Sequence, residues 1–247
     1  MNLENLNNLL AKVHAVKNIS IFFIFNLFYS YALAQDVVLK KNRLTDSVTE
    51  HYYVLKSNED IKNGSYEAFF KRKKYVAVGK FKNNEKIGIW QFFNKDGILV
   101  EKFDYDIYKF TFIQSVTSKN INFLFDDTIK ATDKFTRPLK IGGEYYGFIP
   151  YLNIFKLPFE TFELETRLFD AYVELLISPL GRLAWYKVYI NSNYYDYHQS
   201  FSLDVNLFSD EEKTYLPATK NGVPVLSRII IRCSINDDAG LDFYHNP

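Results

Sequence analysis

The sequence predicts an α+β fold, in which an antiparallel sheet of β-hairpin repeats is followed by a small α+β domain. Two observations carry this prediction. Aromatic residues make up 18% of the 247-residue chain, with 19 Tyr and 23 Phe, and such side chains suit the half-buried pleated surface of a sheet. A short motif recurs in the first half, whereas the second half combines strand patterns with one expected helix. The hydrophobic content of 47% is sufficient for one large domain or two small ones.

The first 34 residues are predicted to be an export signal. Basic residues precede the apolar run 19–25, and the small residues Ala32 and Ala34 fit a signal-peptidase site between Ala34 and Gln35. Cleavage there would release a periplasmic or secreted protein that begins at Gln35. No cysteine follows the apolar run, so the sequence offers no acceptor for lipid attachment at this site.

An uncleaved anchor in the inner membrane, formed by residues 19–34, is the alternative. A membrane-spanning helix needs about 20 mainly apolar residues, whereas Asn26, Ser30 and two tyrosines interrupt this run. Retention of the segment would leave the protein associated with the membrane. The two alternatives therefore predict different cellular fractions.

Residues 35–105 are predicted to form a run of antiparallel hairpins. The segment Lys62–Phe70 recurs as Lys86–Phe93, at a spacing of 24 residues as measured from Gly64 to Gly88. A fixed spacing of this size is typical of stacked supersecondary units that bury their apolar faces against one another. The expected strands include 52–55, 75–81 and 89–93, and the expected turns lie at 62–64, 82–85 and 94–97, where Asn and Gly tolerate a positive φ.

The second copy of the repeat continues into a longer pattern. Gly88-Ile89-Trp90-Gln91-Phe92-Phe93 is followed by Asp96-Gly97 and by Phe103-Asp104-Tyr105, and a weaker copy begins at Gly64. This pattern resembles MORN-type repeats of the variant found in YwqK-like proteins. The resemblance implies a hairpin sheet in which each glycine allows the chain to turn beside an aromatic residue, as Gly88 would beside Trp90. It also implies that the aromatic residues form a shared core.

A transition segment, 106–136, separates the repeats from a second predicted domain over 137–236, which a tail at 237–247 follows. The apolar runs 110–113 and 121–125 of the transition segment fit strands of either neighbour. The second domain is expected to contain a hairpin, a helix and a returning strand, which together form a small α+β layer. These elements are predicted at 172–177 and 183–190 for the hairpin, about 195–208 for the helix and 226–235 for the returning strand.

A turn-rich segment precedes the last strand. It contains Pro217-Ala218, Asn221-Gly222 and Pro224-Val225, and an earlier turn at 178–181 follows the first strand of the domain. These motifs resemble those of the TonB C-terminal domain family, in which an edge strand pairs with a short segment of an outer-membrane receptor through main-chain hydrogen bonds. The resemblance implies a partner-binding edge strand in the last strand of this chain, at Ile229, Ile230, Ile231 and Arg232.

The chain offers no recognisable catalytic or metal-binding pattern. His51 and His198 have no partner at metal-ligand spacing, and the single cysteine, Cys233, lies in an apolar strand pattern typical of a buried, inert thiol. The acidic clusters at 126–127, 210–212 and 237–238 and the basic run 71–74 are expected to be solvated turns. We therefore predict no catalytic residue, no metal and no cofactor, and a protein that is not an enzyme.

The charge balance and the missing catalytic pattern favour a protein-binding function. A formal net charge of +1, from 30 basic and 29 acidic residues, provides no field that would attract nucleic acid. The first hypothesis is a non-catalytic exported protein of the cell envelope whose C-terminal domain binds a protein partner, such as a segment of an outer-membrane receptor. One alternative is a repeat sheet that contacts lipid or protein or acts as an antitoxin-like module. The other is an envelope enzyme.

Overall fold

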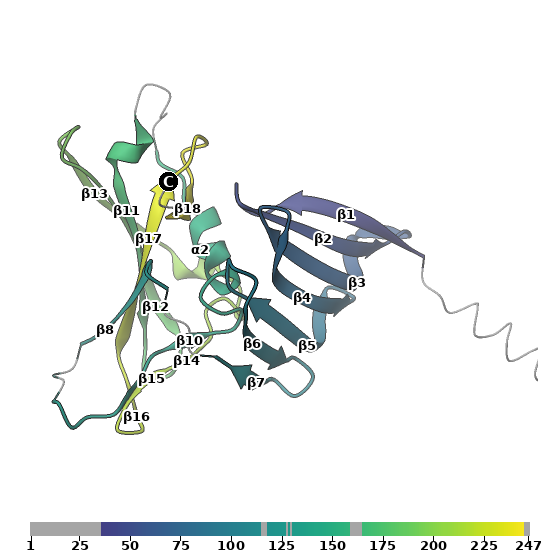
Figure 1. The fold of residues 1–247 in the computed structure, drawn as a ribbon, viewed down its shortest axis with the longest axis horizontal. Helices are drawn as coiled ribbons and strands as arrows, with labels where there is room; N and C mark the ends of the chain where they lie inside the picture. The colour runs from purple at the N-terminus through teal and green to yellow at the C-terminus, as the bar shows by residue number, and fades with distance from the viewer. Residues whose placement is uncertain (1–35, 115–117, 127, 129, 159–164, 245–247) are drawn as a thin grey trace, which may run out of the picture.

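The computed structural model describes residues 36–114, 118–126, 128, 130–158 and 165–244. Two antiparallel sheets lie beside one another, and the short helix α2 (Ile149–Asn153) lies between them (Figure 1). The predicted export signal, its cleavage site at Ala34 and Gln35, and the alternative anchor at 19–34 lie outside the described residues. Within the described ranges, no helix is long and apolar enough to cross a membrane.

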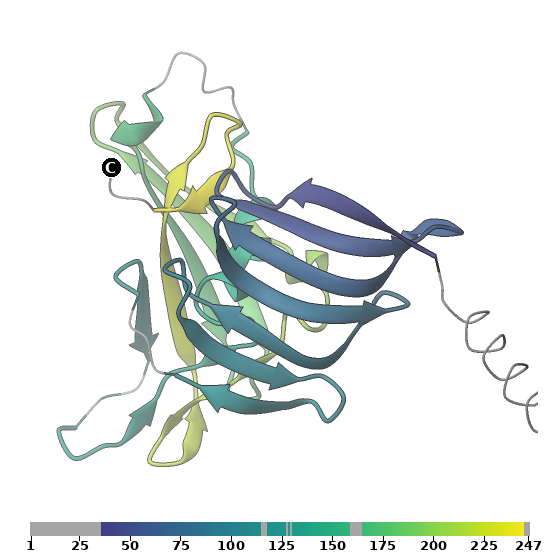
Figure 2. The same cartoon turned by 45° about the vertical axis from the view of Figure 1, so that its right-hand side comes forward.

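The first sheet is a seven-stranded meander in which each strand pairs with the next one along the chain (Figure 2). Its strands are β1 (Val37–Arg43), β2 (Val48–Leu55), β3 (Asn58–Phe70), β4 (Lys74–Lys82), β5 (Glu85–Phe93), β6 (Leu99–Asp104) and β7 (Lys109–Ile113). The antiparallel hairpins predicted for 35–105 are confirmed. Because β7 pairs with β6, the beginning of the transition segment belongs to this sheet.

The predicted turns of the meander are confirmed at two of three places. Asn83 and Asn84 connect β4 to β5 with φ values of 50° and 70°, and Gly97 has φ of 82° before β6. The expected turn at 62–64 is wrong, because these residues lie inside β3. Gly64 has φ of 121° there, and a Cβ added to it would lie 3.0 Å from the Tyr53 Cβ, so the glycine permits an irregular strand against β2.

The 24-residue repeat corresponds to one pair of strands. Tyr66 of β3 and Trp90 of β5 occupy equivalent places, are almost completely buried, and have ring centroids 5.1 Å apart. Gly79 of β4 leaves the space for the indole, since a Cβ added there would lie 2.2 Å from Trp90. The indole Nε1 donates a hydrogen bond to the Lys80 carbonyl oxygen at 3.2 Å. Gly88 has φ of 62°, with no atom close to an added Cβ, so its backbone conformation is what favours glycine.

Two β-bulges repeat with the same spacing. Val76 is skipped in the pairing of β4 with β3, and Val100 is skipped in the pairing of β6 with β5. A bulge turns two consecutive side chains towards the same side of a strand and increases its twist. As a result Val100 and Glu101 are both buried, although they are neighbours in sequence. The bulge in β6 thereby places a carboxyl group inside the molecule.

The second sheet has the strand order β13-β12-β11-β17-β18, and β8 also pairs with β17. These strands are β8 (Ile121–Phe125), β11 (Asp170–Ile177), β12 (Leu183–Ser192), β13 (Tyr197–Leu203), β17 (Ser227–Ile235) and β18 (Leu241–Phe243). The strands predicted at 172–177, 183–190 and 226–235 are confirmed as β11, β12 and β17. The run 121–125 belongs to this sheet as β8, and β18 lies in the segment that was expected to be a tail.

The helix predicted at about 195–208 is wrong. The chain forms β13 there, followed by the single 3-10 turn η3 (Val205–Leu207). Phe201 and Leu203 are half-buried, whereas the alternating Ser200 and Ser202 are exposed, as in a strand with one covered face. Of the residues that the structure describes, 58% lie in strands and 7% in helices, so this part of the chain is mostly antiparallel β-sheet.

The predicted returning strand 226–235, which is β17, is not an edge strand. β17 pairs with β11 along one side, and along the other side Ile229, Ile230 and Ile231 pair with β8. The amide of Arg232 donates to the Asn120 carbonyl oxygen at 2.8 Å, and the strand continues into its pairing with β18. Main-chain groups on both sides of β17 are therefore already used. The partner-binding edge expected at Ile229–Arg232 is wrong.

Short strands connect the two large sheets. They are β9 (Phe135–Thr136), β10 (Leu139–Lys140), β14 (Tyr215–Leu216), β15 (Ala218–Lys220) and β16 (Val223–Val225), and the remaining 3-10 turns are η1 (Tyr146–Phe148) and η2 (Thr166–Leu168). Pro217 lies between β14 and β15, and Asn221 and Gly222 form the tight turn to β16 with φ values of 52° and 82°. The Asn221 side chain accepts a hydrogen bond from the Lys134 amide at 2.9 Å, so this turn is attached to the segment before β9.

One continuous core joins both sheets. Buried residues of the meander, including Tyr66, Trp90 and Phe92, belong to the same apolar cluster as Phe148 and the inward side chains of β11, β12 and β17. The segment between β10 and α2 supplies the contact, because Tyr146 stacks on Phe92 at 5.7 Å between ring centroids. The inner face of the repeat sheet is thus covered by the second half of the chain.

Substitution of Gly79 by Ala tests the packing of Trp90. We expect Gly79→Ala to lower the free energy of unfolding by about 2–3 kcal/mol, because the new methyl group overlaps the indole. In a Trp90→Leu background the same change should be neutral or stabilising by up to about 1 kcal/mol, since alanine restricts the unfolded chain more than glycine does. Urea denaturation of the four proteins measures the difference, and equal losses in both backgrounds would contradict the packing.

Candidate functional site at the junction of the two sheets

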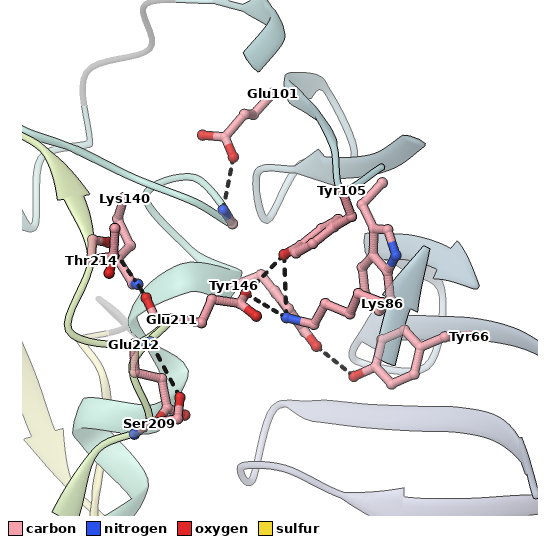
Figure 3. Close-up of polar contacts among 12 residues, drawn as sticks. Tyr66, Lys86, Glu101, Tyr105, Lys140, Tyr146, Ser209, Glu211, Glu212 and Thr214 are labelled. Carbon is pink, nitrogen blue, oxygen red and sulfur yellow. Dashed lines mark hydrogen bonds and ion pairs between the residues drawn. The ribbon is translucent and has the colours of Figure 1, made fainter. Parts of the chain in front are cut away.

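An ion pair connects the two halves of the chain at the junction. Lys86, at the start of β5, lies with its Nζ 2.6 Å from Glu211 Oε1, and the Tyr105 hydroxyl donates to the same oxygen at 2.8 Å (Figure 3). Burial acts to raise the pKa of Glu211, but Lys86, Tyr105 and Lys140 together hold this pKa below its usual value. The carboxylate is therefore charged and fixed at neutral pH.

A local capping arrangement presents Glu211. The Ser209 amide donates to Glu212 Oε2 at 2.7 Å, and the Glu212 amide donates to Ser209 Oγ at 3.3 Å. This reciprocal pair is the Ser-x-x-Glu capping box, which normally begins a helix and here closes a single turn. It holds the turn that carries Glu211 against the repeat sheet.

The repeat contains two equivalent lysines, Lys62 and Lys86. The Lys86 ammonium lies over the rings of Trp90 and Tyr105, at 5.1 and 5.3 Å from their centroids. The equivalent Lys62 lies over the rings of Tyr66 and Phe81, at 5.7 and 5.3 Å. Cation–π contacts of this kind favour a charged side chain at a partly buried position. The two lysines differ in the carboxylate that they contact. Lys62 lies 3.9 Å from Glu50 of its own sheet, whereas Lys86 pairs with Glu211 of the second half of the chain.

Two tyrosine hydroxyls form a second polar contact across the junction. Tyr66 Oη and Tyr146 Oη are 2.7 Å apart, so that one donates to the other. Burial raises the pKa of both hydroxyls, which keeps them protonated. The contact joins β3 of the repeat sheet to η1 of the second half (Figure 3).

Lys140 of β10 is a buried amine within the second half of the chain. Its Nζ donates to the carbonyl oxygens of Glu211 at 2.6 Å and Thr214 at 3.2 Å. Burial lowers the pKa of Lys140 to about 7, although Glu211 opposes the change. The amine thus stabilises the backbone of the turn that carries Glu211, and it titrates near neutral pH.

Glu101 is a buried carboxyl that the bulge in β6 turns inward. Its Oε1 accepts a hydrogen bond from the Gly142 amide at 2.8 Å. Burial raises the pKa of Glu101 to about 7, and the amides of Gly142 and Gly143 and the charge of Lys140 oppose this shift. Gly142 has φ of 107°, and a Cβ added to it would lie 2.6 Å from the Gly147 Cα, so only glycine fits this close approach.

Two cavities flank these polar contacts. The larger, about 590 Å³, is lined by Glu101, Lys140 and residues of both sheets. The smaller, about 370 Å³, is lined by Tyr66, Tyr146 and Glu211 among others. The junction is therefore a set of paired charges and hydroxyls between two spaces.

The residues singled out in the sequence lie mostly away from the junction. Gly64, Gly88 and Trp90 shape the repeat sheet, and Pro217, Asn221 and Gly222 shape the small hairpin of β15 and β16. His51 packs on Phe69 at 5.1 Å between ring centroids, and His198 Nδ1 lies 3.3 Å from Asn191 Oδ1. Cys233 is buried in β17, and burial raises the pKa of its thiol. Of these residues, Trp90 touches the junction through Lys86 and the rings of Tyr66 and Tyr105, and the Gly88 carbonyl oxygen accepts a hydrogen bond from the Tyr105 amide at 3.0 Å.

Sequence reasoning missed the residues that make the junction. The cluster 210–212 was expected to be a solvated turn, which is wrong for Glu211 because it pairs with Lys86. Two signals were present in the sequence: the Ser-x-x-Glu spacing at 209–212 and the recurrence of Lys62 as Lys86. No signal pointed to Glu101, since its burial depends on the bulge. In the ranges that the structure describes, no group of three or more His, Cys, Asp or Glu is placed to hold a metal ion.

No family model, no curated protein and no solved structure matches the chain. The role of the junction is therefore inferred from its own contacts. Its groups are paired with one another: the lysine with a carboxylate, the tyrosines with each other, and the buried amine with carbonyl oxygens. Such an arrangement orients and joins two sheets.

The pKa of Glu101 gives the junction a pH dependence. The carboxyl holds its proton more tightly in the folded than in the unfolded chain, so its stabilising contribution is complete below pH 4.5 and is lost as the pH rises through about 7. Glu101→Gln imitates the neutral form at every pH. Between pH 4.5 and 8, we expect the free energy of unfolding of the wild type to fall by about 3 kcal/mol relative to that of this variant. Denaturant unfolding across this range measures the difference, and parallel curves would contradict a raised pKa.

Proposed function

We propose that the protein is a non-catalytic exported protein of the cell envelope whose C-terminal sheet binds an extended segment of a partner protein. The observation that carries this proposal is the open edge at β13. Among the strands of the described chain, β13 pairs only with β12, so one row of its main-chain groups faces away from the sheet. The strand has seven residues and contains no Lys, Arg, Asp, Glu or Pro.

The other outer strands of the two large sheets are charged or shorter than β13: β8, which pairs only with β17, also lacks charged residues and proline, but it has five residues against seven. Edge strands are commonly guarded against pairing by charged side chains, above all Lys, or by proline. β1 carries Lys40, Lys41 and Arg43, and β7 carries Lys109. β13 instead presents His198, Ser200 and Ser202 as exposed side chains, none of which opposes the approach of another strand. An extended partner segment would pair through main-chain hydrogen bonds and would need few specific side chains.

A TonB-like domain is the finer form of this proposal. The hairpin of β11 and β12 and the returning β17 follow the order that the resemblance implies, which supports it. The position of the expected helix is taken by β13, which opposes it. The candidate edge accordingly moves from β17 to β13. In this proposal the repeat sheet, whose sequence resembles MORN-type repeats, is a platform attached to the binding sheet.

A second candidate function rests on the outer face of the repeat sheet, which would contact lipid or protein. An aromatic row crosses it from β2 to β5, with ring centroids 5.1 Å apart for His51 and Phe69, 4.8 Å for Phe69 and Tyr75, and 6.3 Å for Tyr75 and Phe93. Tyr75 is exposed in this row. Contiguous exposed aromatic surface is typical of interaction sites.

Photo-cross-linking in the native host tests the proposal. A photoreactive phenylalanine analogue is introduced singly at Gln199 of β13, at Lys41 of the charged edge β1, and at Tyr75 of the outer face. We expect a discrete adduct with one envelope protein from position 199 and none from position 41, because β13 has no charged residue, whereas the lysines and arginine of β1 oppose strand addition.

Three results would contradict the proposal. An adduct from position 75 but not from 199 would favour the second candidate function, and equal adducts from positions 41 and 199 would remove the preference for β13. Recovery of the full-length protein in the soluble cytoplasmic fraction would contradict export.

A further inference from the structure

The larger cavity, of about 590 Å³, lies between the two sheets. Val100 and Ile113 line it from the repeat sheet, and Phe123, Phe148 and Phe243 line it from the second half of the chain. Clefts of about 300–1,000 Å³ that combine apolar walls with a few polar groups are typical of small-molecule sites. The cavity has both the size and the composition of such a site.

The charged groups around the cavity favour an anion. Its lining contains five basic residues and three acidic ones: Lys95, Lys119, Arg137, Lys140 and Arg232 against Asp96, Glu101 and Glu144. Arg137 pairs with Glu144, and its guanidinium lies 5.3 Å from the centroid of the Phe123 ring. Glu101 and Lys140 both have a pKa of about 7, so each is partly neutral at neutral pH, and the excess of basic over acidic groups in the lining remains. The cavity therefore has apolar walls beside an excess of positive charge.

Two buried polar atoms of the lining, the Tyr145 hydroxyl and Arg232 Nε, have no hydrogen-bond partner among the described residues. Tyr145 is 8% exposed. The ring is held in place by stacking on Phe243 at 4.5 Å and by an edge contact with Phe70 at 5.7 Å between centroids. Burial raises the pKa of this hydroxyl, so it remains a donor. A buried donor without an acceptor is costly, and a ligand oxygen would satisfy it.

We propose that this cavity binds a small amphipathic organic anion, with an apolar body and a carboxylate or sulfonate head. The apolar body packs against Phe148 and Phe243, the head lies on the side of Arg137 and Lys140, and an oxygen of the ligand accepts a hydrogen bond from the Tyr145 hydroxyl. This site goes beyond the proposed strand addition and does not depend on it, since β13 lies at the far edge of the second sheet (Figure 1).

Titration of the protein with two probes tests the site. The aromatic sulfonate 1-anilinonaphthalene-8-sulfonate is followed by its fluorescence, and dodecanoate is followed by calorimetry and by displacement of the first probe. We expect one saturable site for each probe and mutual competition. Tyr145→Phe, which removes only the hydroxyl, should weaken binding about 5- to 10-fold.

Two tryptophan substitutions on β7 provide a matched control. Ile113 lines the cavity and is 45% exposed, whereas Phe112 is 39% exposed and lies outside the lining. Ile113→Trp should abolish binding by filling the space, and Phe112→Trp should leave the affinity unchanged. Circular dichroism verifies the fold of each variant. If Ile113→Trp does not fold, Arg137→Gln replaces it, with an expected loss of about 5-fold in binding affinity.

Several outcomes would overturn the proposal. Absence of saturable binding in the wild type would do so, as would binding of equal strength to the Ile113→Trp and Phe112→Trp proteins. Binding of the sulfonate alone, without competition by dodecanoate and without an effect of Tyr145→Phe, would assign it to general apolar surface. Cross-linking at β13 reports on strand addition separately, so failure of either proposal is recognised independently of the other.

Discussion

Burial of one face of the repeat sheet determines how the two halves of the chain pack together. A meander of hairpins places Tyr66, Trp90 and Phe92 on the same face, and the sheet itself has nothing to cover them. The second half of the chain provides the cover through Tyr146 and its neighbours. Polar groups that this contact encloses must then be paired, because a buried donor, acceptor or charge without a partner is costly. The ion pair of Lys86 with Glu211 satisfies this requirement.

Local patterns in the sequence predicted much of the fold. Turn residues and apolar alternation placed most strands of both sheets, and the 24-residue spacing predicted the repeated strand pair. The segment 195–208 was misassigned as a helix, although Phe201 and Leu203 alternate with exposed serines as in a strand. The edge at Ile229–Arg232 was misassigned because pairing with β8 joins residues about a hundred positions apart, as in Ile231 with Ile121. The junction depends on such distant contacts and on a bulge, so the sequence carried only weak signals for it.

The two proposals use different consequences of this architecture. Packing of two sheets against each other leaves outer edges, and β13 is the longest described outer strand of the two large sheets without charged residues or proline. The same packing leaves a space at the junction, where the curved sheet and the second half do not meet completely. A protein with such an edge and such a space has the features of a binding protein. The paired groups of the junction, by contrast, serve to hold the sheets in place.

The junction makes both sheets one cooperative unit, and unfolding measured separately in each sheet tests this coupling. In a Trp185→Phe variant, fluorescence reports only on Trp90 of the repeat sheet, because the chain has two tryptophans. Pulsed alkylation of Cys233, the single cysteine, reports on β17 of the second sheet. We expect both signals to change at the same urea concentration, as one transition requires. Two separate midpoints would contradict it.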